Sequence, residues 1–140
     1  MMRRLLRPAA FAIIFMGLDG VWLSQAGPRL YTPLLGDLLA AKPRLLAAAA
    51  FYAIYLFAAY RFGPGDAPNA PLRAAWRGGL FGFAAYATYD LTNEATLKVW
   101  PLQLTLIDLL WGTCLTAFAS YLAVSVARRA DQSAASETAS

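Results

Sequence analysis

Four long apolar stretches, separated by short charged or proline-rich segments, divide this chain. A helix needs about 20 mainly apolar residues to cross the roughly 30 Å hydrocarbon core of a bilayer. The shortest stretch lies between Arg44 and Arg61, whose long side chains can reach the interface and so extend it. The pattern predicts an all-α fold, a membrane-spanning four-helix bundle with spans near residues 8–28, 45–60, 78–97 and 102–126.

The composition indicates a single membrane domain. Of the 140 residues, 59% are hydrophobic and 14% are charged, which is too apolar for an ordinary soluble domain. We expect an N-terminal segment over residues 1–7 and a single transmembrane domain over 8–126. Because the residues that follow are small and polar, a disordered tail is expected over 127–140.

Basic residues are unevenly distributed between the two sides that these spans would create. Cytoplasmic loops of membrane proteins carry an excess of Lys and Arg, so the richer side predicts the cytoplasm and places both termini there. A cleavable signal peptide is the alternative for the first span, but Asp19 and Trp22 interrupt its apolar core and no small-x-small cleavage site follows. The richer side holds Arg3, Arg4, Arg7, Arg61, Arg73, Arg77, Arg128 and Arg129, and the other holds Arg29, Lys42, Arg44 and Lys98.

Two of the connecting segments have recognisable patterns. In the first outer loop, residues 30–43, Thr32 before Pro33 resembles an N-cap followed by proline at the first helical position. A short interfacial helix lying on the membrane surface is therefore predicted there. Residues 62–71 are rich in glycine and proline, which predicts a flexible connector.

The residue types present exclude several kinds of chemistry. The chain has no histidine and one cysteine, Cys114, so disulfides within the chain, thiolate metal sites and imidazole catalysis are excluded. No cofactor and no metal is expected, and Cys114 is expected to be a small buried residue. The net charge of +4 does not predict nucleic-acid binding, because the basic residues flank apolar runs rather than form a basic face.

Half of the eight acidic residues fall inside the predicted spans. An Asp near the centre of a transmembrane helix costs about 2.5–3.5 kcal/mol on insertion scales, so such residues normally face protein or water and are candidate functional residues. At about 1.5 Å of rise per residue, three of them lie roughly 12–14 Å below the outer boundary. We expect these three carboxylates, Asp19, Asp90 and Asp108, to meet inside the bundle.

The third span also carries a column of polar side chains. Glu94 lies one turn from Asp90 on the same helix face, with Asn93 beside it and Tyr86 one turn below Asp90. An alternative for Glu94 is an ion pair with Lys98 four residues later. Tyrosines of the second span, Tyr52 and Tyr55, could donate hydrogen bonds to the acids.

A short motif occurs in both the first and the fourth span. Asp19 precedes Trp22, and Asp108 precedes Trp111, by three residues in each case. At this spacing Asp and Trp share a helix face, so each indole could border the carboxylate of a neighbouring helix. Because the two helices run in opposite directions, the pair resembles an inverted repeat of the kind that frames transporter sites.

Alternatives without a functional site remain open. Each Asp could be protonated and hydrogen-bonded to a neighbouring Tyr or Thr, as a structural contact. Glycines at the start of the third span have a small-xxx-small spacing that predicts close packing against another helix. The candidate ligand- or proton-binding residues are Asp19, Trp22, Tyr86, Asp90, Asn93, Glu94, Asp108 and Trp111, and no catalytic residue is assigned.

Three spans carry short motifs that together are distinctive, at residues 18–19 with 22–23, 86–93, 95–98, 100–102, and 107–108 with 111–112. These motifs resemble an uncharacterised family of short, four-span, predicted bacterial inner-membrane proteins, a domain of unknown function. The resemblance covers nearly the whole chain except the two termini. It implies a bacterial cytoplasmic membrane and four spans, but no activity, and it implies an apolar residue at the position of Glu94.

Three functions compete. The favoured one is a proton- or cation-coupled carrier or binding protein for a small or amphipathic solute, because crowded carboxylates in a low dielectric can exchange a proton for a cation. An intramembrane lipid-modifying enzyme that uses a carboxylate acid/base pair is the second. The third is an accessory subunit of a membrane complex. The expected partners are the lipid bilayer, a small-molecule or lipid ligand, and a second copy or a larger membrane complex, without nucleic acid.

Overall fold

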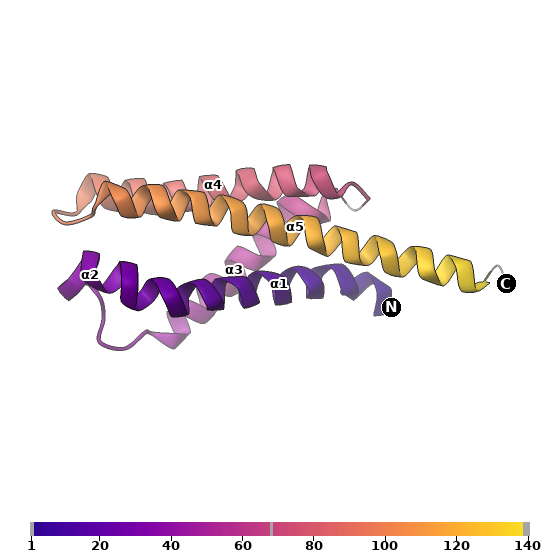
Figure 1. Ribbon diagram of the computed structural model, residues 1–140, viewed down its shortest axis with the longest axis horizontal. Helices are drawn as coiled ribbons and strands as arrows, with labels where there is room; N and C mark the ends of the chain where they lie inside the picture. Colours follow the sequence, from indigo (N-terminus) through magenta and orange to yellow (C-terminus); the bar gives the residue numbers. More distant parts are fainter. Residues whose placement is uncertain (1, 68, 139–140) are drawn as a thin grey trace.

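The computed structural model describes the backbone of residues 2–67 and 69–138, and the side chains of residues 5–67 and 69–136. Within these ranges it is all-helical, without a strand, as predicted. The long helices are α1 (Met2–Ala26), α3 (Leu45–Tyr60), α4 (Pro71–Thr96) and α5 (Leu102–Thr138), and both termini lie at one end of the molecule (Figure 1). The shorter helical segments are η1 (Gly27–Tyr31), α2 (Thr32–Leu35), η2 (Gly36–Leu38) and η3 (Arg61–Gly65).

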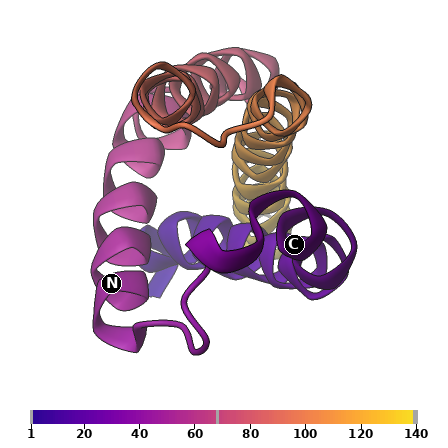
Figure 2. The same cartoon turned by 90° about the vertical axis from the view of Figure 1, so that its left-hand side faces the viewer.

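Three helical segments are long and apolar enough to cross a membrane, namely Leu5–Leu38, Leu45–Gly65 and Leu102–Ser136. The third predicted span lies on α4, which is not among them. Its two arginines, its two acidic residues and Asn93 lower the mean hydropathy of this helix. In space α4 nevertheless runs alongside α5 within the same bundle (Figure 2).

Helices α4 and α5 approach one another along a seam of small residues. A Cβ atom added to Gly78 would overlap Ser120, one added to Gly82 would overlap the backbone at Gly112, and one added to Gly112 would overlap the ring of Tyr86. Only glycine allows backbones to come this close. The small-xxx-small spacing thus has the packing role that its sequence predicted.

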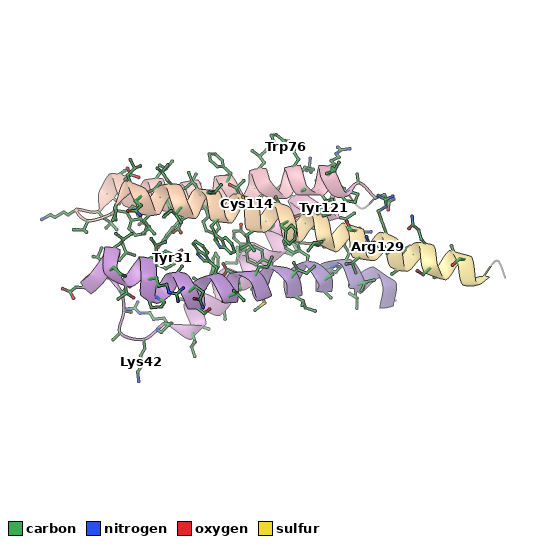
Figure 3. The ribbon with its side chains drawn as sticks, in the orientation of Figure 1. Tyr31, Lys42, Trp76, Cys114, Tyr121 and Arg129 are labelled. Atoms are coloured by element: carbon green, nitrogen blue, oxygen red, sulfur yellow. The ribbon has the colours of Figure 1, made fainter. Side chains whose placement is uncertain are left out.

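The other two long helices pack less closely. Phe11 and Phe15 of α1 meet Tyr55 of α3 and Leu115 of α5 in one buried cluster. Outside it, α3 crosses the bundle obliquely and touches α1 and α4 over short stretches (Figure 2). Many large apolar side chains face outward; Ile13 is 72% exposed and Trp76 is 74% exposed. Figure 3 shows Trp76 on the outside of the bundle. An exterior of this kind is typical of helices surrounded by lipid.

The first connection differs from its prediction. A short helix does form at Thr32–Leu35, but it continues from α1 through the π-helical turn η1 rather than starting separately. Thr32 is therefore not the N-cap; Tyr31 is, and it makes no side-chain capping bond. The Thr32 hydroxyl instead donates to the carbonyl of Gly27 at 2.9 Å. The helix ends at Gly36, which has a positive φ of 48°.

The connector before α4 is more ordered than its glycines and prolines predicted. The π-helical turn η3 extends α3, and Gly63 and Pro64 are buried. Arg77 holds the segment, because its Nε donates to the carbonyl of Phe62 at 2.8 Å and its Nη2 pairs with Asp66 at 2.6 Å. Pro68, part of the predicted flexible connector, lies outside the described residues.

The tail also differs from expectation. Disorder was expected over 127–140, whereas α5 continues as a helix to Thr138. The segment contains neither glycine nor proline and has several alanines, which favour helix. Hydroxyls of Ser133 and Ser136 donate to helix carbonyls three or four residues earlier. Residues 139–140 lie outside the described residues, and the domain limits remain a prediction.

Candidate functional site

A cavity of about 650 Å³ opens between the helices at the end where α1 passes into α2. All four long helices contribute to its wall, and residues after α1 close it from one side. Figure 3 shows Tyr31 inside this space, whereas Lys42 points outward. The lining residues are Asp19, Trp22, Leu23, Tyr31, Leu35, Leu39, Ala48, Phe51, Tyr52, Tyr55, Ala85, Tyr86, Tyr89, Trp100, Asp108 and Trp111.

Asp19 of α1 is held by donors from two other helices. The Tyr52 hydroxyl of α3 donates to its Oδ2 at 2.6 Å, and the Trp111 indole of α5 donates to its Oδ1 at 3.2 Å. The carboxylate is 4% exposed. Both carboxylate oxygens therefore accept a hydrogen bond from a neighbouring helix. Tyr55, the other expected donor, is bonded instead to Thr116 at 2.8 Å.

Asp108 of α5 also accepts a hydrogen bond, and Tyr31 links it to a tryptophan. The Tyr31 hydroxyl donates to its Oδ1 at 2.7 Å, and the Trp22 indole donates to the Tyr31 oxygen at 3.2 Å. Trp22 and Trp111 stack with ring centroids 4.4 Å apart and planes 13° apart. The two Asp-x-x-Trp motifs therefore meet, as the sequence predicted, and join both acids in one continuous set of contacts.

The electrostatic character of the cavity follows from its wall. Two acidic residues line it, and no basic side chain does so among the described residues. Most of the remaining wall is aromatic, including Tyr86, and Tyr89 packs edge-on against Trp100 with centroids 5.7 Å apart. Aromatic faces carry partial negative charge. The cavity thus presents negative potential in apolar surroundings.

Three predicted site residues lie outside this cavity. Asp90 does not line the cavity; it is fully buried where α4 packs against α5. Glu94 accepts a 2.7 Å hydrogen bond from Thr105, and within the described residues it has no ion pair with Lys98. Asn93 is half-buried and does not line the cavity. Sequence position alone did not indicate how α4 is rotated about its axis, which decides the residues that line the cavity.

Tyr31 was missed because the sequence placed it in an outer loop. The π-helical turn η1 shifts the phase of the helix and turns Tyr31 towards Trp22. The α-helical periodicity of a sequence does not reveal such a shift. The apolar loop residues Leu35 and Leu39, expected on a membrane surface, likewise form part of the cavity wall.

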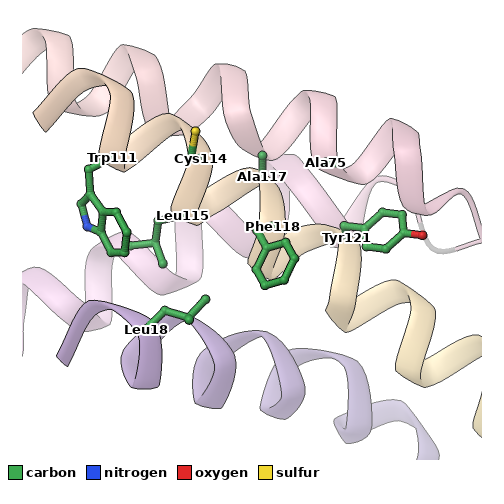
Figure 4. A pocket seen from close by; sticks show the side chains of 8 residues that line it. All are labelled: Leu18, Ala75, Trp111, Cys114, Leu115, Ala117, Phe118 and Tyr121. Carbon is green, nitrogen blue, oxygen red and sulfur yellow. The ribbon is translucent and has the colours of Figure 1, made fainter. Parts of the chain in front are cut away.

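A separate apolar groove of about 540 Å³ lies between α1, α4 and α5 (Figure 4). Trp111 lines both this groove and the cavity, so its ring is a shared wall. Cys114 borders the groove and is exposed, which corrects the expectation that it is buried. The groove offers no polar group near its walls comparable to the acids of the cavity.

The comparisons with known proteins agree with this architecture. A family model described as predicted membrane protein (DUF2177) matches residues 5–125. The chain belongs to this family. The resemblance seen in the sequence motifs is thereby confirmed, and the matched range covers the cavity residues of every helix. No curated protein and no solved structure matches the chain.

Proposed function

We propose that this family member is a multi-pass protein of the bacterial cytoplasmic membrane that binds a small amphipathic cation in its cavity and exchanges it for protons. In this proposal all four long helices span the bilayer and both termini are cytoplasmic. The apolar exterior, three apolar helical segments and the close packing of α4 on α5 support four spans. The excess of arginines on the side of the termini supports the orientation.

The observation that carries the proposal is the presence of Asp19 and Asp108 in one cavity without a lining basic residue. Burying an unbalanced charge is costly unless a partner of opposite sign is nearby. A ligand with one positive charge would supply that partner for both acids. Asp108 keeps Oδ2 available, since its known hydrogen bond uses Oδ1.

The rest of the wall suits the remainder of such a ligand. Cations are attracted to the faces of Trp and Tyr, by about 0.5–2 kcal/mol for each contact. Trp22 and Tyr86 line the cavity together with the two acids, while Leu23, Leu35 and Leu39 add apolar surface. An ammonium group with a short hydrocarbon chain matches both parts. The cavity volume of about 650 Å³ is within the range of small-molecule sites.

The lipid-modifying enzyme has less support. An acid/base pair needs one carboxyl that can donate and one that can accept a proton. Asp19 has both oxygens occupied by donors, Tyr52 and Trp111, and is therefore held as an acceptor. The geometry suits binding of a positive charge better than proton donation to a lipid.

Binding of hexyltrimethylammonium to the full-length protein in nanodiscs tests the proposal. Titration calorimetry and tryptophan fluorescence should both report saturable binding, whereas hexanesulfonate, which has a similar chain and the opposite charge, should not bind. Asp19→Asn and Asp108→Asn should each weaken binding about tenfold or more, because each removes a buried partner of the cation.

The matched control is Asp37→Asn, which makes the same charge change at an exposed residue outside the cavity. Its affinity should equal that of the unmodified protein. Equal binding by the cavity variants and the control, or equal binding of the sulfonate, would contradict the proposal. A lipid species that disappears in a deletion strain and returns with the unmodified gene would instead favour the enzyme.

A further inference from the structure

Asp90 is a buried acid that takes no part in the cation binding proposed for the cavity. Its side chain is 0% exposed, and neither carboxylate oxygen has a hydrogen-bond partner among the described residues. It does not line the cavity. Asp19 and Asp108, with similar burial, are both hydrogen-bonded. The lack of partners is thus particular to Asp90 and requires a separate explanation.

The register of α4 on α5 locates Asp90 relative to the cavity. Tyr86 packs against Gly112, one turn before Asp90, and Glu94 bonds to Thr105, one turn after it. Because the helices are antiparallel, Asp90 faces the turn of α5 between these contacts, and that turn carries Asp108. These two contacts lie on either side of Asp90 along the α4–α5 seam.

Whether Asp90 is protonated depends on the free-energy cost of burying each form of its carboxyl group. An ionised carboxylate that is buried without a partner costs several kcal/mol even after relaxation. A neutral polar group left without a hydrogen bond costs about 1–3 kcal/mol. The ionisable groups that interact with Asp90 are Tyr89 and Glu94 on its own helix and Asp108 on α5, and none of these three is basic. Negative neighbours oppose ionisation further.

The geometry points to Asp90 as a proton-binding site, separate from the cavity, whose proton leaves when a cation occupies the space beside Asp108. In the step, the O–H bond of the Asp90 carboxyl breaks, its electron pair stays on the carboxylate, and the proton passes to solvent buffer. The bound cation offsets the charge of Asp108, so that an ionised Asp90 costs less. Release of the proton when a cation binds rests on the proposed function, whereas the assignment of Asp90 as a proton-binding site does not.

Infrared spectroscopy of the full-length protein in nanodiscs tests the proton site without any ligand. Near neutral pH the unmodified protein should show the C=O stretch of a protonated carboxyl group. Asp90→Asn should abolish that band, and Asp90→Glu should keep it at a shifted frequency. Absence of the band in the unmodified protein, or its persistence in Asp90→Asn, would overturn the assignment. Asp90→Asn keeps the side-chain shape, and its thermal unfolding verifies that it folds.

Proton release tests the exchange. Titration with hexyltrimethylammonium in two buffers of different ionisation enthalpy should show release of up to about one proton for each bound probe. Asp90→Asn should bind the probe and release none, while Asp37→Asn should release as much as the unmodified protein. Binding without release in the unmodified protein would overturn the exchange.

The two experiments distinguish a failure of the cation-binding proposal from a failure of the proton-site proposal. If the infrared band is present and depends on Asp90, but the probe does not bind, then the proton site is supported while the proposed function and the exchange are both overturned. If the probe binds and the band is missing, the cavity proposal is supported and Asp90 is an ordinary buried residue.

Discussion

Replacing Gly112 by alanine tests the seam between α4 and α5, on which the shape of the cavity depends. The added Cβ would overlap the base of the Tyr86 ring, including its Cγ, so a rotation of the ring alone cannot clear the space. Either the helices separate or Tyr86 leaves the cavity wall. Overpacking of this kind costs typically about 1–3 kcal/mol. Alanine recovers up to about 1 kcal/mol through its better helix propensity.

The expected net result for Gly112→Ala is a loss of about 1–2 kcal/mol of unfolding free energy, as overpacking outweighs propensity. Gly17→Ala is the matched control, because it lies in α1 with nothing within 4 Å of the added Cβ. It should be unchanged or slightly more stable. The unfolding free energies of both variants are measured by raising the SDS fraction in mixed micelles while circular dichroism monitors the loss of helix. Equal stability of the two variants would refute the described packing of α4 on α5.

Three further substitutions test individual contacts. Tyr52→Phe removes a donor to the buried carboxylate of Asp19 and should cost about 1–3 kcal/mol of unfolding free energy, measured in the same micelles. Thr105→Val, nearly equal in shape, leaves Glu94 without its hydrogen bond and should lower the thermal unfolding midpoint, whereas an unchanged midpoint would show that the bond is dispensable. Arg77→Ala should change overall stability by only about 0–1 kcal/mol, since its ion pair is partly exposed, yet limited proteolysis should cleave the connector before α4 faster.

Much of the helical architecture was predictable because charges and prolines mark where apolar stretches end. The range predicted for the second span, 45–60, is also the observed range of α3, between Arg44 and Arg61. The tail was wrongly expected to be disordered, because low hydropathy alone does not prevent a helix that grows from an existing one. Helix continuity from α1 into α2 was missed because the first span was expected to end at Pro28, whereas the π-helical turn η1 carries the helix past this proline.

The candidate site was predictable to the extent that it depends on depth and on helix faces. The Asp-x-x-Trp motifs correctly indicated that Asp19 and Asp108 lie near one another and near tryptophans. Their depth did not determine the rotation of α4, and Asp90 does not line the cavity with them. Tyr31 depends on a local π-helical turn, for which the sequence carries no periodic signal.

The stacked indoles of Trp22 and Trp111 give the protein an optical property of its own. Two indoles whose centroids lie 4.4 Å apart couple their electronic transitions, which gives a paired positive and negative signal in far-ultraviolet circular dichroism when the in-plane transition directions of the two rings differ. One indole belongs to α1 and the other to α5, so the amplitude of this couplet depends on the spacing and mutual orientation of these helices. A change in that spacing when a cation is added can therefore be followed without attaching a label.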